Sequence, residues 1–275
     1  MTQPAVTFQI KQLEEHFSTR LFDRGHGHIA LTPAGEIVLE YAERILGLSA
    51  ELDTRLKELT GEISGVLFIG ASMTIAEFLL PQVLGEFRSR YPKVLPRLVV
   101  ANSETVEARV AEHTLDIGFI EAPSHLAVLV SDFCAEDELL VLCAPSHALA
   151  ALDAVTPDQL LPHAFISREP GSGTREVTDH YFQKAGIRLD SLETVMELGS
   201  PEAIKGLVST GLGFAIMSRS TISKELRLGQ LVGVPLAPRL MRTLSVVFPK
   251  ERFRSRLADT FIEFAKERLR KGAQG

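Results

Sequence analysis

Apolar residues at the start of the chain recur about once per helical turn. They are Val6, Ile10, Leu13 and Phe17. This spacing predicts a short helix with a single apolar stripe. Thr2 is suited to cap its start, and Pro4 lies in the first turn, where a missing N–H is tolerated. The segment Gly25-His26-Gly27-His28 then predicts a turn between two short strands at 21–22 and 29–31.

A long helix is predicted next, with Thr32 as its N-cap, Pro33 as its first residue and Gly61 at its end. Its apolar seam follows near-heptad steps through Ile37, Tyr41, Ile45, Leu48, Leu52, Leu56 and Leu59. At 1.5 Å per residue such a helix is about 40 Å long, which is more than a small domain needs. The pattern favours a dimerising linker helix, and an ordinary buried helix is the alternative.

From Ser64 onward, short apolar strands alternate with helices. The predicted strands are 66–69, 98–100, 115–120, 138–143, 164–166, 194–198, 213–217 and 244–248. The predicted helices are 75–90, 104–112, 174–185, 201–209 and 252–270. The pattern restarts after Pro145, so it predicts two α/β units in series, each with a largely parallel sheet.

Composition restricts the class of protein further. The chain has 275 residues, of which 45% are hydrophobic and 23% are charged, as in ordinary globular proteins. Two cysteines are too few for a disulfide framework. No secretory leader and no long apolar run is present, so a soluble cytoplasmic protein is predicted. The net charge of −6 gives no indication of a nucleic-acid partner, so that conclusion has to come from local pattern.

Four stretches near the start resemble the LysR-type transcriptional regulators. They are Thr2-Gln3-Pro4-Ala5-Val6-Thr7, Gln9-Ile10-Lys11-Gln12-Leu13-Glu14-Glu15, Leu21-Phe22-Asp23-Arg24 and Leu31-Thr32-Pro33-Ala34-Gly35. Their order and spacing match the recognition helix, the wing and the start of the linker helix in that family. The resemblance implies a homodimeric or homotetrameric regulator that binds operator DNA, responds to a small-molecule effector, and needs no cofactor, metal or membrane. It also points to the subgroup that controls carbon fixation or sulfur-oxyanion metabolism.

The resemblance implies an α/β fold class with three parts. Residues 1–31 would form a partial winged helix-turn-helix, and residues 32–61 the linker and dimerisation helix. Residues 62–275 would form an effector-binding domain similar to type 2 periplasmic binding proteins. Its first subdomain would comprise 62–143 and 245–275, and its second subdomain 144–244. Effector binding between the two would close them about strands that cross near 143–145 and near Leu244.

The chain departs from the family pattern at its start. Family members place two helices before the recognition helix, whereas this sequence begins at the recognition helix itself. The apolar stripe on that helix would then lack much of the surface that it is patterned to bury. We therefore expect an N-terminally truncated winged helix-turn-helix, and weak or absent operator binding by the chain as given.

The residues expected to contact DNA lie on the outer side of the first helix and in the wing. Gln3 is suited to an adenine edge, and Thr7 to a base or a phosphate. Lys11 and Arg24 are suited to phosphates, which position a protein without reading sequence. The full set of DNA-binding candidates is Thr2, Gln3, Pro4, Thr7, Phe8, Lys11 and Arg24. The alternative is a solvated helix, because the local charges balance.

The residues expected to contact the effector follow predicted strands, at the edge where parallel strands end and helices begin. They are Ser72, Thr74, Asn102, Ser103, Glu121, Ser167, Gly173, Thr174 and Ser200. Ser72 and Thr74 match the family position that commonly touches the effector. The alternative for Ser72, Thr174 and Ser200 is helix capping alone.

The donor-rich residues favour an anionic ligand, such as a carboxylate. Glu121 argues against an anion unless it pairs with an arginine or holds a cation or an amine. Arg168 and Arg175 have a simpler alternative role, because each precedes a glutamate with which it can pair at the surface, an interaction of little consequence for stability.

No enzymatic constellation stands out. The segment Gly171-Ser172-Gly173-Thr174 lacks the lysine of a P-loop, and no nucleophile elbow has a convincing acid and histidine partner. The histidines are scattered, so a zinc site is not expected. Cys134 and Cys143 are predicted to be buried inert thiols, with a redox pair as the alternative. The main alternative function is a cytoplasmic small-molecule (solute) binding protein of the same two-lobed fold.

Overall fold

The computed structural model describes residues 3–25, 28–58, 63–250 and 254–272. The chain divides into two compact units, Met1–Asp53 and Thr54–Gly275. Among the described residues, none of the helices combines the length and the apolar character needed to cross a bilayer.

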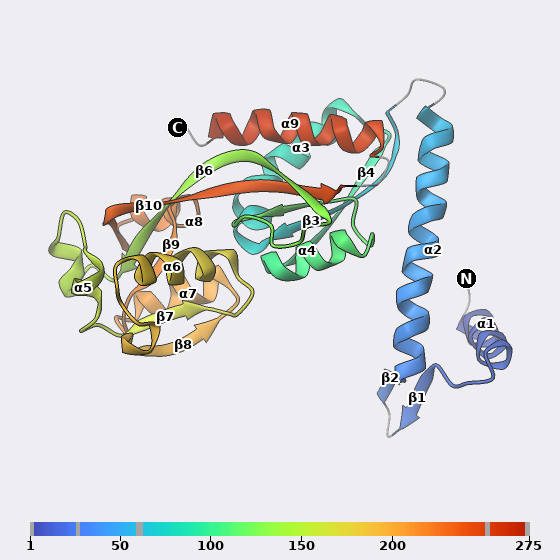
Figure 1. The fold of residues 1–275 in the computed structure, drawn as a ribbon, viewed down its shortest axis with the longest axis horizontal. Helices are drawn as coiled ribbons and strands as arrows, with labels where there is room; N and C mark the ends of the chain where they lie inside the picture. The colour runs from blue at the N-terminus through green and yellow to red at the C-terminus, as the bar shows by residue number, and fades with distance from the viewer. Residues whose placement is uncertain (1–2, 26–27, 59–62, 251–253, 273–275) are drawn as a thin grey trace. The chain divides into compact units, whose positions relative to one another are not determined.

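The first unit contains the predicted helix, the wing and most of the long helix. Helix α1 spans Gln3–His16, strands β1 and β2 span Phe22–Gly25 and His28–Leu31, and helix α2 begins at Pro33 and continues to Glu58 (Figure 1). The two strands pair antiparallel, which confirms the predicted hairpin. The carboxylate of Glu14 joins α1 to this hairpin, because it accepts a hydrogen bond from the backbone N–H of Leu21 at 2.8 Å.

The start of α2 is fixed as predicted. The Thr32 hydroxyl accepts a hydrogen bond from the backbone N–H of Gly35 at 3.0 Å and donates one to the Arg20 carbonyl at 2.7 Å. Thr32 is therefore an N-cap. The predicted apolar seam is largely exposed, at Ile37, Tyr41, Ile45, Leu48, Leu52 and Leu56. Leu59 and the predicted end at Gly61 lie outside the described residues.

The second unit is built on a six-stranded sheet with the strand order β4-β3-β5-β10-β6-β9. Its strands are β3 (Gly65–Ser72), β4 (Val94–Ala101), β5 (Ile117–Ile120), β6 (Leu129–Cys143), β9 (Ala215–Ser218) and β10 (Val232–Pro249). A separate parallel pair is formed by β7 (Phe165–Arg168) and β8 (Thr194–Leu198). Strands β6 and β10 pair antiparallel along most of their length and run side by side through the whole unit (Figure 1).

We call lobe 1 the part of this unit formed by β3, β4 and β5 with three helices and a π-turn. These are the π-turn η1 (Ile75–Leu79), α3 (Leu80–Arg90), α4 (Ser103–Ala111) and α9 (Arg256–Gly272). Alternate residues of β3 enter different clusters: Leu67 and Ile69 pack with α3 and α9, while Phe68 packs with α4. Both faces of β3 are therefore covered, which is why its sequence is nearly continuously apolar.

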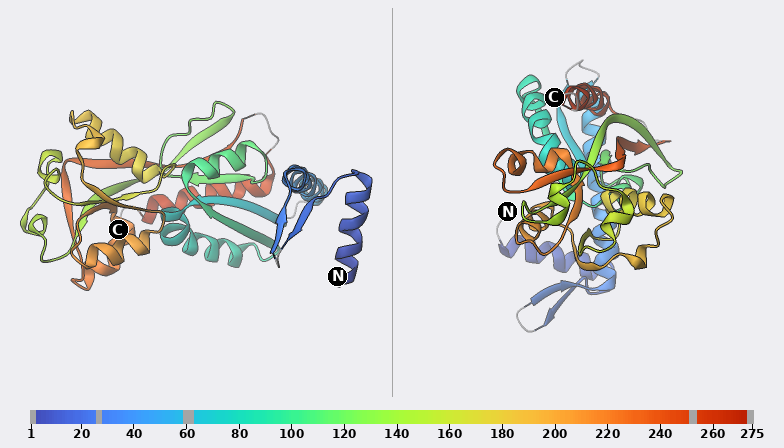
Figure 2. Two further views of the ribbon diagram at one scale, coloured as in Figure 1. Left: turned by 90° about the horizontal axis from the view of Figure 1, so that it is seen from below. Right: turned by 90° about the vertical axis from the view of Figure 1, so that its left-hand side faces the viewer.

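We call lobe 2 the part formed by β7, β8 and β9 with α5 (Pro157–Leu160), α6 (Gly173–Lys184), α7 (Pro201–Ser209) and α8 (Arg219–Arg227). Lobe 2 has two hydrophobic clusters, on opposite faces of β6. Leu139 and Val141 belong to the cluster that includes residues of α6. Leu140 and Leu142 belong to the cluster that includes residues of α7 and α8. Figure 2 shows the two lobes as separate groups of helices joined through β6 and β10.

The cores change from one lobe to the other within these two strands. On β6 the change falls between Ala135, which packs in lobe 1, and Leu139, which packs in lobe 2. On β10 it falls between Leu240 and Leu244. The crossing expected near Leu244 is close to this place, while the one expected at 143–145 lies farther along β6. The subdomain bounds proposed from the sequence stay predictions.

Several details of the predicted elements were wrong. The six-stranded sheet is not largely parallel, because β10 pairs antiparallel with β5 and β6, and β9 pairs antiparallel with β6. The helix predicted over 75–90 has these bounds, but its first five residues are π-helical and only the rest is α-helical. Strands β6 and β10 begin well before the predicted 138 and 244, since charged residues interrupt their apolar pattern where they pass between the lobes. Helices α5 and α8 were not predicted at all.

Candidate functional site

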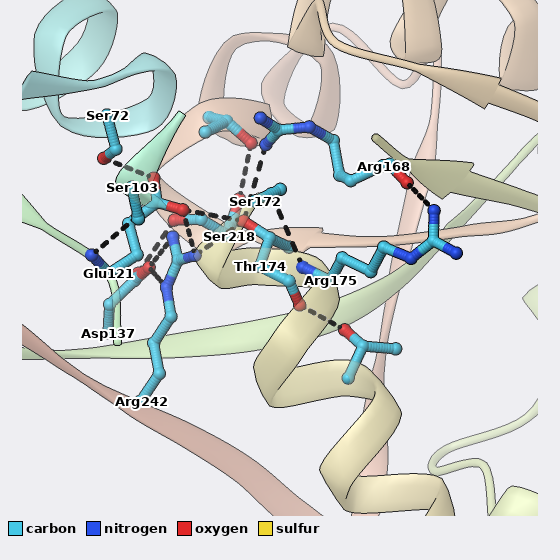
Figure 3. Close-up of polar contacts among 12 residues, drawn as sticks. Ser72, Ser103, Glu121, Asp137, Arg168, Ser172, Thr174, Arg175, Ser218 and Arg242 are labelled. Carbon is cyan, nitrogen blue, oxygen red and sulfur yellow. Dashed lines mark hydrogen bonds and ion pairs between the residues drawn. The ribbon is translucent and has the colours of Figure 1, made fainter. Parts of the chain in front are cut away.

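The carboxylate of Glu121 lies at the junction of the two lobes and is 1% exposed. It follows β5 directly, so the end of that strand carries it into the junction. Ser72 donates a hydrogen bond to Oε1 at 2.9 Å, and Thr174 donates one to Oε2 at 2.9 Å. Arg242 donates to Oε2 at 3.0 Å, and the Thr74 hydroxyl also bonds to this carboxyl. Lobe 1, lobe 2 and a connecting strand thus all donate to one carboxylate (Figure 3).

Arg242 links this carboxylate to a second one. Its Nε donates to Oδ2 of Asp137 at 2.8 Å, its Nη2 lies 2.6 Å from the same oxygen, and its Nη1 lies 2.7 Å from the Thr174 hydroxyl. Ser218 donates to the other Asp137 oxygen at 2.8 Å. Arg242 and Asp137 are directly opposed residues of the paired strands β10 and β6. Strand register therefore fixes the ion pair in place. Figure 3 shows Arg242 and Asp137 within this group of polar contacts.

The electrostatics of this cluster favour the charged forms of Glu121 and Arg242. Burial alone would raise the pKa of Glu121, but Arg242 and the hydroxyl of Thr74 together hold that pKa below its ordinary value. Burial alone would lower the pKa of Arg242, but Glu121 and Asp137 raise it. The neighbouring Arg168 guanidinium is also buried and pairs with Glu169 at 2.8 Å. The junction is thus a network of buried charges, each matched by an opposite charge or by hydrogen bonds.

The backbone of lobe 2 reaches α4 of lobe 1 beside this network. The side chain of Asn102 donates to the carbonyl of Pro170 at 3.2 Å, and the N–H of Glu104 donates to the carbonyl of Gly171 at 3.2 Å. Gly171 has a φ of +79°, which glycine adopts without strain. These contacts hold the start of α6 against the start of α4.

Gly173 also lies close to lobe 1. A Cβ atom built there would lie 2.9 Å from the Ser103 hydroxyl and 3.0 Å from the Cβ of Glu121. Only glycine fits at this distance without a shift of its neighbours. The sequence singled out Gly173 for a donor-rich loop, and the structure shows that it also permits close contact.

Two further contacts join the lobes at the rim of the junction. The ring of His125, which follows β5, lies 2.9 Å from the carboxylate of Glu176 on α6. The hydrogen bond and the charge of Glu176 raise the pKa of His125. The ammonium of Lys205 on α7 lies 5.1 Å from the centre of the Phe78 ring on the π-turn. Lobe 2 thus contacts the residues that follow β3 as well as those that follow β5.

The structure brings together most of the predicted effector residues. Ser72, Thr74, Ser103, Glu121, Gly173 and Thr174 all lie in the cluster around the Glu121 carboxylate. Asn102 caps α4 through the N–H of Thr105 at 2.9 Å as well as bonding across the junction. Among the residues that the structure describes, no hydrogen bond joins the Glu121 cluster to Ser167 or Ser200. Ser167 is buried on β7, and Ser200 caps α7.

Four residues of the network were not among the predicted site residues: Arg168, Asp137, Ser218 and Arg242. The alternative given for Arg168 was a surface pair with Glu169; it does pair with Glu169, but it is buried. Arg242 and Asp137 lie in strands that begin before their predicted starts at 244 and 138. The sequence feature that could have indicated Arg242 is its place as the single charged residue in the run Leu240-Met241-Arg242-Thr243-Leu244. An arginine is rarely buried in a strand unless it has a partner of opposite charge.

The predicted DNA-contacting residues of α1 lie on an exposed surface. Gln3, Pro4, Thr7, Phe8 and Lys11 are all exposed. The Thr7 hydroxyl donates to the Gln3 carbonyl at 3.0 Å, and Lys11 lies 3.7 Å from Glu15. Thr2 and the side chain of Arg24 lie outside the described residues. This exposed surface agrees with the expected orientation but does not test DNA contact.

The two cysteines are buried free thiols. Burial raises the pKa of Cys134 to about 12 and that of Cys143 to about 11. A thiol with so high a pKa is almost entirely protonated at neutral pH and reacts slowly.

Comparison with known proteins gives a consistent result across the chain. The family model described as "LysR substrate binding domain" matches residues 60–270, and the one described as "Bacterial regulatory helix-turn-helix protein, lysR family" matches residues 1–36. A "Probable RuBisCO transcriptional regulator" of Cyanidium caldarium is 36% identical over 266 residues, which cover 95% of this chain and 84% of the relative. The "Uncharacterized HTH-type transcriptional regulator YeiE" of Escherichia coli K12 is 37% identical, with 96% and 88% covered.

Solved structures show the same fold. The Synechocystis PCC6803 CcmR regulatory domain in complex with 2-phosphoglycolate is 27% identical, with a TM-score of 0.68 over 74% of this chain and 96% of that one. A peroxide-bound cysteine mutant of Corynebacterium glutamicum OxyR gives a TM-score of 0.73 at 20% identity over 100% of this chain and 86% of that one. Matches to both family models separate this chain from solute-binding proteins of similar fold. The chain belongs to the LysR-type transcriptional regulators, a non-enzymatic family with a helix-turn-helix and an effector-binding domain.

Proposed function

We propose that this regulator binds an anionic small-molecule effector at the junction of lobes 1 and 2. The observation that carries this proposal is the convergence of Ser72, Thr174 and Arg242 on one buried carboxylate position. Hydroxyl groups and a guanidinium are the donors with which proteins bind carboxylates and phosphates. The N-terminus of α6, where Thr174 lies, adds a favourable partial charge for an anion.

The effector class is supported by one similar protein. The CcmR regulatory domain was solved with 2-phosphoglycolate, which carries both a carboxylate and a phosphate. We propose a ligand of that chemistry, a small acid with one or two anionic groups, for this chain. Binding would shift the equilibrium between arrangements of the two lobes, because only a difference in affinity for two states can shift their populations.

Calorimetry with 2-phosphoglycolate tests this proposal. Ser72→Ala removes one hydroxyl donor from the junction. This change is expected to weaken binding of 2-phosphoglycolate about tenfold, since a hydrogen bond from that hydroxyl to the anionic ligand would be lost. Ser89→Ala is the matched control, because Ser89 is exposed on α3 and bonds only to the Gly85 carbonyl of its own helix. Equal affinities in the wild type and in Ser72→Ala would remove Ser72 from the site.

For DNA, we propose that this chain binds its operator weakly. The apolar stripe of α1 is uncovered, with Val6 44%, Leu13 39% and Phe17 48% exposed. A recognition helix that is not packed on its inner side is poorly fixed for docking in a groove. A gel shift on the promoter region beside the gene tests this, and nanomolar binding at physiological salt would contradict it.

We also propose a homodimer formed through the apolar seam of α2, in the cytoplasm. Exposed residues at near-heptad spacing are suited to pair with a second helix. Ile45→Glu puts a charge into that seam, where Ile45 is 64% exposed. Sedimentation is expected to show a shift toward monomer for this variant and none for Glu40→Gln. A wild-type monomer at micromolar concentration would contradict the proposal.

A further inference from the structure

The Glu121 carboxylate already has every partner that a bound carboxylate ligand would need. An ionised carboxylate offers about four acceptor positions. Ser72 and Thr74 of lobe 1, Thr174 of lobe 2, and Arg242 of the connecting strand all bond to it. With 1% of its surface exposed, Glu121 is bound by the junction as a ligand would be.

The donors in this shell come from different parts of the fold. Ser72 ends β3, Thr174 begins α6, and Arg242 lies within β10. A carboxylate that bonds to all of them holds lobe 1 and lobe 2 together. The Glu121 carboxylate therefore bridges the two lobes, as a bound effector would in a two-lobed binding domain, but it belongs to the chain itself.

The balance of charge argues against a second anion beside it. The junction holds the buried carboxylates of Glu121 and Asp137 and the buried guanidinium of Arg242, while the buried Arg168 is paired with Glu169, whose side chain is 24% exposed. Arg168 is matched by Glu169, so the two buried carboxylates Glu121 and Asp137 share the single charge of Arg242. An anion entering next to Glu121 would meet a like charge at close range in a poorly solvated place, which is unfavourable.

Resting on the proposed function, we propose that Glu121 is an internal ligand that competes with the anionic effector for Arg242 and Thr174. The effector anion binds only as the Glu121 carboxylate leaves these donors. Glu121 thereby sets the affinity of the site, and it excludes weak monoanions that cannot displace it. A ligand with two anionic groups has the advantage, since it can replace the lost bonds and add others.

The test is calorimetry on the full chain with 2-phosphoglycolate and with acetate as probes. Glu121→Gln keeps the size of the side chain and removes its charge. It leaves Arg242 balanced by Asp137, so the fold is expected to persist. We expect this variant to bind 2-phosphoglycolate at least tenfold more tightly than the wild type. Asp132→Asn is the matched control: it removes a carboxylate that is 44% exposed and paired with Lys266, away from Arg242, and its affinity should equal that of the wild type.

A cavity-forming variant gives an independent measurement. Glu121→Ala removes the carboxylate and leaves its donors in place, with room for a small acid. Acetate at millimolar concentration is expected to raise the melting temperature of Glu121→Ala along a saturating curve, and to leave the wild type and Asp132→Asn unchanged. Glu121→Asp serves if neither of the other variants folds. It keeps the charge but is shorter by one methylene, so it should bind 2-phosphoglycolate at least threefold more tightly than the wild type.

The possible outcomes separate this inference from the proposed function. If the wild type binds 2-phosphoglycolate and Glu121→Gln binds it no more tightly, the internal ligand is refuted and the effector site stands. If Asp132→Asn gains as much affinity as Glu121→Gln, the gain is a general effect of net charge and the internal ligand is again refuted. If the wild type and all Glu121 variants bind neither probe, the anionic effector site and the internal ligand both fall.

Discussion

Replacing Arg242 by methionine should destabilise the second unit more than almost any other single change. Methionine retains the approximate length of the side chain and removes the guanidinium. The change would leave Glu121 and Asp137, both buried, without the cation that lies 3.0 Å from one and 2.6 Å from the other. It also removes the hydrogen bond to the Thr174 hydroxyl at 2.7 Å.

The expected cost follows from what is left unpaired. Breaking a buried ion pair by removing one partner costs about 3–5 kcal/mol, because the remaining charge is poorly solvated. With about 2–4 °C per kcal/mol for a domain of this size, the melting temperature should fall by roughly 6–20 °C. Adding Asp137→Asn and Glu121→Gln to Arg242→Met removes the orphaned charges. The triple variant should therefore recover part of the loss, so the effects should not be additive.

Urea unfolding followed by far-ultraviolet circular dichroism measures this cost, since the chain has no tryptophan to report by fluorescence. Arg239→Met is the control on the same strand. Arg239 is 73% exposed and lies 3.6 Å from Glu138, so its loss should cost less than about 1 kcal/mol. Equal losses for Arg242→Met and Arg239→Met would refute the view that the buried network supports the junction.

Three further predictions concern other parts of the chain. A methyl group at Gly35 would overlap the backbone carbonyl of Leu21, which precedes β1. Gly35→Ala should therefore lower the free energy of unfolding by about 1–3 kcal/mol and expose the first unit to protease. Gly85→Ala is the control: the space around Gly85 is open, so this change should stabilise α3 by about 0.5–1 kcal/mol. The raised pKa of His125 means that the stabilisation from its bond to Glu176 is fully present below pH 6.5 and is lost as the pH rises through the raised pKa. A nuclear magnetic resonance titration should show a lower His125 pKa in Glu176→Gln than in the wild type. An unchanged pKa would contradict this assignment. Cys134 should resist iodoacetamide at pH 8 in the folded chain and react only after denaturation, and rapid labelling of the native state would show that the thiol is accessible.

The sequence predicted the order of elements well because most of the elements have a clear period. The stripe of α1, the Thr32 cap and the bounds of β8 and α7 follow from local pattern. The antiparallel pairings of β9 and β10 could not be predicted, since the direction of a strand depends on a distant partner. The same holds for the early start of β6, where polar residues hide the strand.

The site was only partly predictable for a related reason. Ser72, Glu121 and Thr174 lie at strand ends and helix starts, where a general rule for α/β sheets places ligands. Arg242 and Asp137 lie in the middle of long strands, and no local rule marks the middle of a strand as functional. They meet because β6 and β10 pair in one particular register, which is a property of the whole fold.

The register of β6 and β10 places the buried ion pair of Asp137 and Arg242 at the boundary between the two hydrophobic cores. On β6, Asp137 lies between Ala135 of the lobe 1 core and Leu139 of the lobe 2 core. On β10, Arg242 lies between Leu240 and Leu244, which divide in the same way. The pair therefore sits where one hydrophobic core has ended and the other has begun, so no apolar cluster has to accommodate it. A charge placed there is coupled to both lobes at once, because each lobe supplies part of its hydrogen-bonding shell. Any ligand that changes the bonding of Arg242 must then act on the packing of lobe 1 against lobe 2, which is the property that a metabolite-responsive regulator requires.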